Sequence, residues 1–160
     1  MLGITIIAVG KIKEKYFTEA INEYAKRLSA YCRLNIIELK DEPIPENPSE
    51  REIATVLEKE GKRIIEKLPK SAYIIPLCIE GKSKSSVEFS DMLGMTASAG
   101  ASEIVFIIGG SLGISNNIKT MANYRLSFSE MTFPHQLMRV ILLEQLYRAF
   151  NISNGGKYHK

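Results

Sequence analysis

The sequence is poor in the residues that build metal sites, disulfide frameworks and hydrolytic centres. Its 160 residues include no tryptophan, two histidines and two cysteines. Cys32 and Cys78 form no CxxC pair and have no histidine at metal-ligand spacing, so we interpret both as reduced core residues. Paired carboxylates, a Ser-His-Asp order and clustered metal ligands are also missing. The sequence therefore predicts no metal and offers no candidate for these reaction classes.

Long apolar runs are missing too. None approaches the ~20 residues that cross a bilayer, so we expect no membrane contact. The first ten residues, MLGITIIAVG, are apolar, but no charged segment precedes them and no cleavage signal follows. They are typical of a buried strand and not of a signal peptide. We therefore expect a soluble, cytoplasmic protein.

What is present is an ordinary globular composition, 45% hydrophobic and 24% charged. A chain of this length can bury a core as one domain, which we expect to span 1–160. The net charge is only +3, but its distribution is uneven. Residues 1–80 carry 13 basic and 13 acidic side chains, whereas residues 81–160 carry 8 and 5. The C-terminal half could therefore face an anionic partner.

The pattern along the chain alternates strand and helix. Short apolar runs predict five strands, over 4–9, 33–39, 72–79, 103–110 and 124–129. Such alternation predicts an α/β fold with a mainly parallel sheet flanked by helices. In such sheets, ligands bind beyond the carboxyl ends of the strands. We therefore expect function in the loops after residues 79, 108 and 128.

Helix signals separate these strands. Apolar residues spaced by three and four predict a helix after the first strand, with Phe17, Ile21, Tyr24, Leu28 and Tyr31 on one face. Capping boxes that begin at Ser49 and Ser85 predict two more helix starts. A short helix is expected around 115–122. Pro76 is awkward inside its predicted strand, because proline cannot donate to a ladder; a free side or a bulge would resolve this.

Pro134 is suited to the first turn of a long final helix. The apolar residues of that helix wrap well past one stripe, and they are Leu137, Met138, Val140, Ile141, Leu142, Leu143, Leu146, Tyr147 and Phe150. A helix that is apolar nearly all round must be covered on two sides. A second chain is the natural cover in a protein of this size, so we predict a homodimer through this helix.

Two segments at predicted strand ends could bind a ligand. Gly109-Gly110-Ser111-Leu112-Gly113 follows a buried strand, but its spacing fits neither a dinucleotide fingerprint nor a phosphate-binding P-loop. It could equally be a tight strand-to-helix turn. The loop from Phe128 to Gln136 could line an apolar slot with its backbone polar groups facing a planar ligand, or simply connect two core elements. His135 alone is more typical of a structural first-turn histidine than of a catalyst.

The chain ends in Lys157-Tyr158-His159-Lys160, which is either a frayed, solvated end or a functional tail. With these residues the chain resembles a known family over essentially its whole length. The segments that carry the resemblance are ITIIAVGKIKEKY, IIGGSLG, LSFSEMTFPHQLMRVILLEQLYRAF and the closing YHK. They are similar to the ribosomal RNA large subunit methyltransferase H family of the SPOUT class.

The resemblance implies a cytoplasmic homodimer with a C-terminal trefoil knot, whose threaded loops hold S-adenosylmethionine. It implies methylation of N3 of a pseudouridine in a stem-loop of 23S ribosomal RNA, within the assembled ribosome. The cofactor-binding positions it implies are Leu77, Gly109, Phe128, Ser129, Glu130, Met131, Thr132 and Phe133. Leu112 and Cys78 depart from the family pattern. Both are side-chain differences in a site that is held largely by backbone, so they weaken the assignment little.

Within this framework His159 is a candidate base or proton relay, and Tyr158 could stack on or orient the target base. A tail that crosses from the partner subunit would explain why dimerisation matters. The residues expected to contact RNA phosphates are Arg125, Arg139, Lys157 and Lys160. Two other functions stay open at this point, a non-catalytic RNA-binding or ribosome-assembly factor with the same fold, and a nucleotide-binding protein. The glycine turn lacks the lysine that the latter would need.

Overall fold

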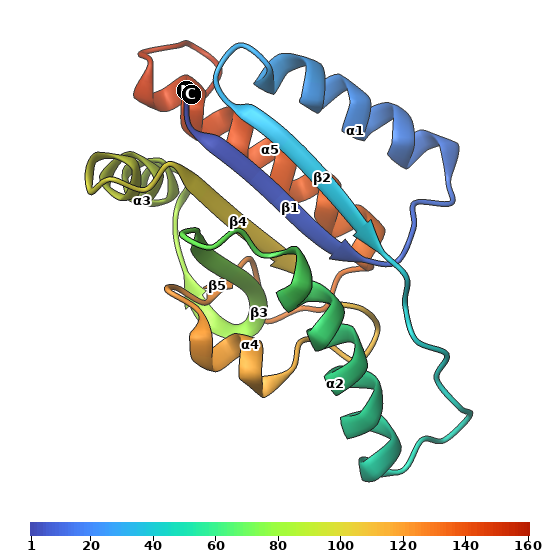
Figure 1. Cartoon of the computed structure of the whole chain (residues 1–160). Helices are drawn as coiled ribbons and strands as arrows, with labels where there is room; N and C mark the ends of the chain where they lie inside the picture. Colours follow the sequence, from blue (N-terminus) through green and yellow to red (C-terminus); the bar gives the residue numbers. More distant parts are fainter.

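The computed structural model describes all 160 residues as a five-stranded parallel sheet with helices on both faces (Figure 1). The strand order is β2-β1-β4-β3-β5, and every neighbouring pair is parallel, which confirms the predicted sheet type. In chain order the elements are β1 Gly3–Val9, α1 Lys15–Leu28, β2 Arg33–Leu39, α2 Glu50–Lys67, β3 Tyr73–Ser83, α3 Ser86–Ser98, β4 Glu103–Ile108, α4 Asn116–Met121, β5 Leu126–Ser127 and α5 His135–Ser153.

The two faces of the sheet carry separate cores, because successive strand residues point to opposite sides. On one face Ile4 and Ile6 of β1 pack with buried residues of α1, α3 and α5, which include Leu28, Phe89 and Leu142. On the other face the neighbouring strand residues pack with α2 and α4, through Ile64 and Ile118 among others. Figure 1 shows α5 running behind β1 and β2. Cys32 and Cys78 are both buried and free, one in each core, as predicted.

Three strands, β3, β4 and β5, end at different residues from those predicted. β4 ends at Ile108 because the glycines that follow turn the chain, and β5 is only two residues long. β3 extends to Ser83 because it bulges: Leu126 of β5 pairs first with Leu77 and again with Lys82. Gly81 makes this bulge possible, since a Cβ there would lie 2.7 Å from the Arg125 carbonyl oxygen.

Pro76 lies where β3 changes partners. Pairing with β4 ends at Pro76, and pairing with β5 begins at Leu77. On the side of β3 away from β4, Asn123 accepts from the Ile74 N–H and donates its own N–H to the Ile74 carbonyl. The proline therefore removes no donor that the continuous part of the ladder needs.

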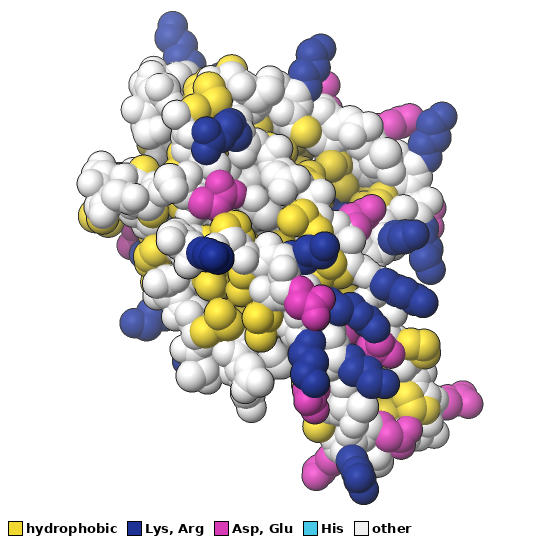
Figure 2. Space-filling model, in the orientation of Figure 1, with side chains coloured by type: hydrophobic (Ala, Val, Ile, Leu, Met, Phe, Trp, Pro, Cys, Tyr) yellow, Lys and Arg dark blue, Asp and Glu magenta, His cyan; other side chains and the backbone are white.

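The helix starts follow the sequence signals closely. Ser49 and Ser85 each accept a hydrogen bond from the third helical N–H, and Glu52 and Glu88 complete both capping boxes. Pro134 is the N-cap of α5 and not its first residue. Figure 2 shows Lys, Arg, Asp and Glu side chains mixed over α2, as expected for a solvated face. No helix combines the length and the apolarity that crossing a membrane requires.

Much of the cover that α5 needs comes from the same chain. Its buried residues face the sheet, and it packs between α1 and α3. Leu137, Val140 and Ile141 stay half-buried. The predicted homodimer therefore has a narrower apolar stripe to cover than the sequence pattern suggested, and it remains a prediction.

Candidate functional site

The three loops that sequence reasoning selected meet in one pocket of about 700 Å³ at the carboxyl ends of the strands. Leu77–Glu80 come from β3, Ile108–Ile114 from the end of β4 and the turn after it, and Phe128–His135 from the connection between β5 and α5. Most of these residues line the pocket, and more than half of its lining residues are hydrophobic. This place in the fold is where parallel α/β sheets bind their ligands.

Seven of the eight predicted cofactor-binding residues line this pocket, namely Leu77, Gly109, Phe128, Ser129, Met131, Thr132 and Phe133. The eighth, Glu130, is exposed and does not line it. Glu80, Lys119 and Met138 also line the pocket but were not predicted, and so does His135, which belongs to the loop expected to line a slot but was not among the predicted cofactor-binding residues. Met138 was hidden by its place in the final helix, whose pattern indicated only packing.

The glycine turn is both a tight turn and a pocket wall. A Cβ at Gly109 would lie 2.4 Å from the carbonyl oxygen of Gly113, so only glycine fits. Gly113 has a φ of +88°, and its N–H donates to the Gly110 carbonyl at 3.0 Å. The carboxylate of Glu60 in α2 lies beside the turn, because a Cβ at Gly110 would be 3.2 Å from its Oε1. It accepts a hydrogen bond from the Glu42 N–H at 2.9 Å, and burial raises its pKa. Backbone therefore forms this wall.

Hydrogen bonds fix the path of the third loop, one from the end of β5 to β3 and one within the loop itself. Ser127 Oγ donates to the Ile79 carbonyl at 2.9 Å, and Ser129 Oγ accepts from the Met131 N–H at 3.0 Å. Met131 itself is 74% exposed at the edge of the pocket. The loop thus has a fixed path with one large apolar side chain free to contact a ligand.

Few polar side chains face the pocket, and two of them satisfy each other. Lys119 and Glu80 form an ion pair, and the hydrogen bond from Lys119 lowers the pKa of Glu80. Burial raises the pKa of the Cys78 thiol. No three His, Cys, Asp or Glu side chains come together in an arrangement that could hold a metal ion. Recognition in this pocket must therefore depend largely on shape and on backbone groups.

The predicted catalytic pair lies elsewhere in the chain. Tyr158 Oη donates to Glu144 at 3.1 Å, and the Tyr158 N–H donates to Asn151 at 3.0 Å. Burial and the Glu144 bond raise the pKa of Tyr158 to about 12. The guanidinium of Arg148 lies 4.7 Å from the Tyr158 ring centre and 3.2 Å from His159 Nδ1.

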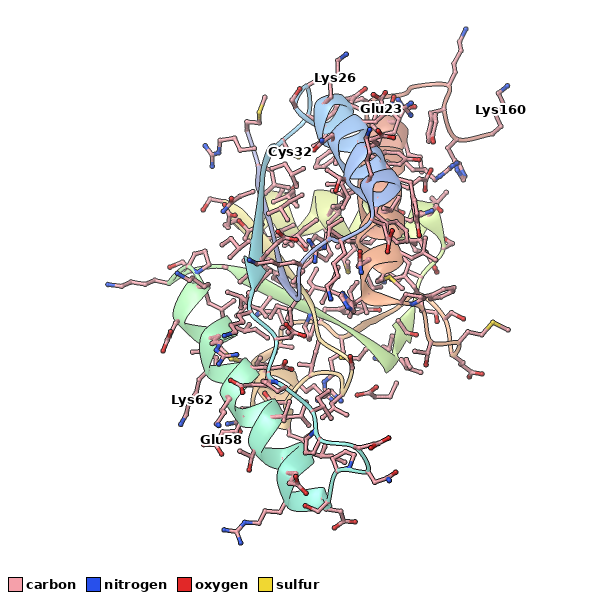
Figure 3. All side chains as sticks on the ribbon, turned by 90° about the vertical axis from the view of Figure 1, so that its right-hand side faces the viewer. Glu23, Lys26, Cys32, Glu58, Lys62 and Lys160 are labelled. Atoms are coloured by element: carbon pink, nitrogen blue, oxygen red, sulfur yellow. The ribbon has the colours of Figure 1, made fainter.

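These contacts hold the tail against the last turns of α5. The pocket touches α5 only as far as Met138, ten residues before Arg148, which is about 15 Å along a helix. Figures 1 and 3 place the C-terminus and Lys160 at the end of the molecule where the strands begin, whereas the residues that line the pocket lie at the carboxyl ends of the strands. One chain alone therefore does not bring Tyr158 and His159 to the pocket.

The predicted RNA contacts divide into exposed and buried residues. Arg125, Lys157 and Lys160 are exposed and form no ion pair. For Arg139 the prediction is wrong, because its side chain is 1% exposed. Its guanidinium donates to Glu38 at 2.6 Å and to the Gly10 carbonyl at 3.1 Å, so it is a structural cation that joins α5 to the ends of β1 and β2.

Comparison with known proteins agrees with this architecture. A family model described as "Predicted SPOUT methyltransferase" matches residues 2–159. Proteins of Clostridium novyi and Bacillus cytotoxicus, both named ribosomal RNA large subunit methyltransferase H, are each 54% identical over 99% of this chain and 100% of their own length. A protein of Methanococcus maripaludis is 55% identical over the same shares.

Among solved structures, the SpoU methyltransferase AviRb from Streptomyces viridochromogenes, in complex with AdoMet, is 13% identical with a TM-score of 0.47. That match covers 97% of this chain and 59% of the other, so this chain spans about three-fifths of its length. The family model and the full-length relatives carry the assignment: the chain belongs to the SPOUT methyltransferase family.

Proposed function

We propose that the protein is an S-adenosylmethionine-dependent methyltransferase of the large ribosomal subunit, acting on N3 of a pseudouridine in a 23S ribosomal RNA stem-loop of the assembled ribosome. The observation that carries the proposal is the meeting of three separate loops in one largely apolar pocket. The names and matching lengths of the relatives support the substrate class. A ribosomal substrate would place the protein in the cytoplasm, and the family resemblance adds a C-terminal trefoil knot to the proposal.

The pocket suits this cofactor. Its volume of about 700 Å³ lies within the roughly 300–1,000 Å³ that small-molecule sites occupy. Leu77 and Phe128 offer apolar walls for a planar base, and the glycine turn lets backbone N–H and carbonyl groups approach closely. Leu77, Gly109 and the loop from Phe128 to Phe133 would hold the cofactor, with Glu130 outside the contact.

The proposed methyl transfer requires few catalytic side chains. When bound, S-adenosylmethionine supplies an electrophilic methyl group on its sulfonium. The pocket must hold that group in line with the target nitrogen at roughly 3–3.5 Å, which contributes on the order of 7–11 kcal/mol. N3 of pseudouridine carries a proton, so a base adds roughly 10²–10⁴-fold. His159 is our candidate for this base or for a proton relay, and Tyr158 for orienting the target base.

These roles need a second chain. Within one chain the tail lies about 15 Å along α5 from the pocket, by helix rise. A homodimer through α5 would cover the half-buried stripe of Leu137, Val140 and Ile141 and could bring one subunit's tail to the other's pocket. Arg125, Lys157 and Lys160 would then contact phosphates near the completed site, with binding that weakens as salt rises.

The decisive experiment incubates ribosomes that lack the modification with the protein and labelled S-adenosylmethionine, and then analyses 23S ribosomal RNA by mass spectrometry. A labelled N3-methylpseudouridine is expected. Calorimetric titration should show S-adenosylmethionine binding that S-adenosylhomocysteine competes away. Heat-silent titrations together with tight ribosome binding would instead establish the non-catalytic RNA-binding factor.

The tail is tested with mixed dimers. One variant lacks residues 158–160 and the other carries Gly109→Val, which blocks the pocket at the Gly113 carbonyl. We expect each homodimer to be inactive, the tail-less one to bind cofactor normally, and co-expressed mixed dimers to regain part of the activity. Full turnover by the tail-less homodimer would refute the role of the tail, and no recovery in verified mixed dimers would refute its action across subunits.

A further inference from the structure

The first turn of α5 places an unassigned histidine in the pocket wall. The imidazole of His135 packs on Gly10, where a Cβ would lie 2.9 Å from the ring atom Cε1. Gly10 has a φ of +97°, and its N–H donates to the Leu39 carbonyl at 2.7 Å. Its own carbonyl accepts from Arg139 at 3.1 Å. The ring of a pocket-lining residue therefore rests on backbone that is fixed from both sides.

Two buried nitrogens near this ring have no partner in the chain. They are Nδ1 of His135 and Nε of Arg139, which lie one turn apart on α5. The other two nitrogens of Arg139 are engaged, Nη1 with Glu38 and Nη2 with Gly10. A guanidinium nitrogen can only donate, whereas Nδ1 of a neutral imidazole can accept. The two unpartnered atoms are therefore a complementary acceptor and donor, which one bridging water could join.

Such a bridge would decide which ring nitrogen carries the hydrogen. If Nδ1 turns its lone pair toward Arg139, the hydrogen of the neutral ring lies on Nε2. Nε2 is the nitrogen that the protein does not enclose, so it is the one that a pocket ligand can reach.

The charges around the ring favour its neutral form. Burial lowers the pKa of His135, Arg139 on its own helix lowers it further, Asp41 after β2 opposes this, and Lys13 from the loop after β1 lowers it slightly. The ring is therefore neutral at physiological pH. Neutrality suits a pocket for a sulfonium cofactor, because an imidazolium would repel the ligand's positive charge.

We propose that His135 is a cofactor-recognition residue, whose Nε2–H donates a hydrogen bond to an acceptor atom of S-adenosylmethionine in the pocket. The inference rests on the proposed function, which supplies the cofactor. It also goes beyond the sequence analysis, which found His135 more typical of a structural first-turn histidine than of a catalyst. The ring has a structural role and a binding role: one face packs on Gly10, and its Nε2 edge hydrogen-bonds to the ligand.

Binding is tested with three variants of the full chain. Glutamine can place an amide N–H where Nε2 lies, whereas His135→Asn is too short and His135→Phe keeps a ring without nitrogens. We expect His135→Phe and His135→Asn to weaken S-adenosylmethionine binding roughly 3- to 10-fold, the range for one net hydrogen bond, and His135→Gln to retain most of the affinity. Calorimetry gives the dissociation constants, and thermal unfolding verifies that each variant is folded.

A second measurement does not depend on variants. The chain has only two histidines, so nitrogen-15 NMR of histidine-labelled protein resolves both rings, and a His159→Gln sample assigns them. His135 should be the neutral Nε2–H tautomer, and its Nε2 signal should shift when S-adenosylmethionine is added. An Nδ1–H tautomer, or His135→Phe binding within about twofold of the wild type, overturns the inference. Absence of binding by the wild type would instead overturn the proposed function.

Discussion

Replacing Arg139 with methionine would test its structural role directly. Methionine keeps much of the apolar stem but leaves Glu38 without its cation and the Gly10 carbonyl without a donor. We count the bond to Glu38 as about 1 kcal/mol, below the usual range for charged partners, because that side chain is 39% exposed. The unsatisfied carbonyl adds about 1–3 kcal/mol. The free energy of unfolding should therefore fall by about 2–4 kcal/mol.

At roughly 2–4 °C per kcal/mol for a chain of this size, Tm should fall by about 4–16 °C. Denaturant titration at one fixed protein concentration gives the free energy, because association would shift it. Lys160→Met is the matched control; Lys160 is exposed, so its change should stay within about 0.5 kcal/mol. If Arg139→Met were as stable as this control but bound ribosomes less well, Arg139 would be an RNA contact after all.

The difference in free energy of unfolding between the wild type and Arg139→Met should depend on pH, and its sign can be worked out. Burial raises the pKa of Glu38, but hydrogen bonds from Arg139 and from the Ile12 N–H outweigh it, so the pKa is lowered overall. A lowered folded pKa gives stability that is present above the unfolded value, about 4.3, and is lost as pH falls through the folded value. The gap between wild type and Arg139→Met should therefore narrow below about pH 4. A gap that widens in acid would contradict the ion pair.

Three further predictions concern the glycines, a cysteine and a helix cap. Gly109→Ala should weaken S-adenosylmethionine binding at least tenfold, because its Cβ would meet the Gly113 carbonyl. Gly94→Ala, in open space within α3, should stabilise the protein by about 0.5–1 kcal/mol. If calorimetry gave the two variants equal affinities for S-adenosylmethionine, that would argue against the turn as a pocket wall. Burial raises the pKa of Cys32 to about 11, so a thiol reagent should titrate Cys32 only after denaturation, and its rapid labelling in the native protein would contradict its burial. Ser49→Ala removes the α2 capping box and should cost about 1 kcal/mol in denaturant titration; an unchanged midpoint would show that the cap contributes nothing.

Local signals in the sequence predicted much of the fold. Apolar runs marked all five strands, and the two capping boxes marked helix starts to the residue. Strand ends were less certain, because a pairing partner decides them. The run 124–129 alternates like a strand, yet only Leu126 and Ser127 find a partner, at a bulged edge of β3.

In the candidate site too, local sequence features were predictable and long-range contacts were not. Its three loops were predictable, because a parallel sheet brings all strand ends to one side. The role of Arg139 was not, because its partners Glu38 and Gly10 lie 101 and 129 residues away in the chain. A lone arginine in an apolar helix carries no sign of such distant acceptors, so sequence reasoning assigned it to the surface. His135 was undervalued for the same reason, since its support on Gly10 is a long-range contact.

The length of the final helix sets the distance between the pocket and the C-terminal tail. Its 19 residues measure about 28 Å, with the pocket wall at one tip and the folded tail at the other. If the two helices of a dimer packed antiparallel, each C-terminal tail would lie beside the pocket of the other subunit. If they packed parallel, both tails would stay far from both pockets. The direction in which two copies align would then decide whether the site can be completed at all.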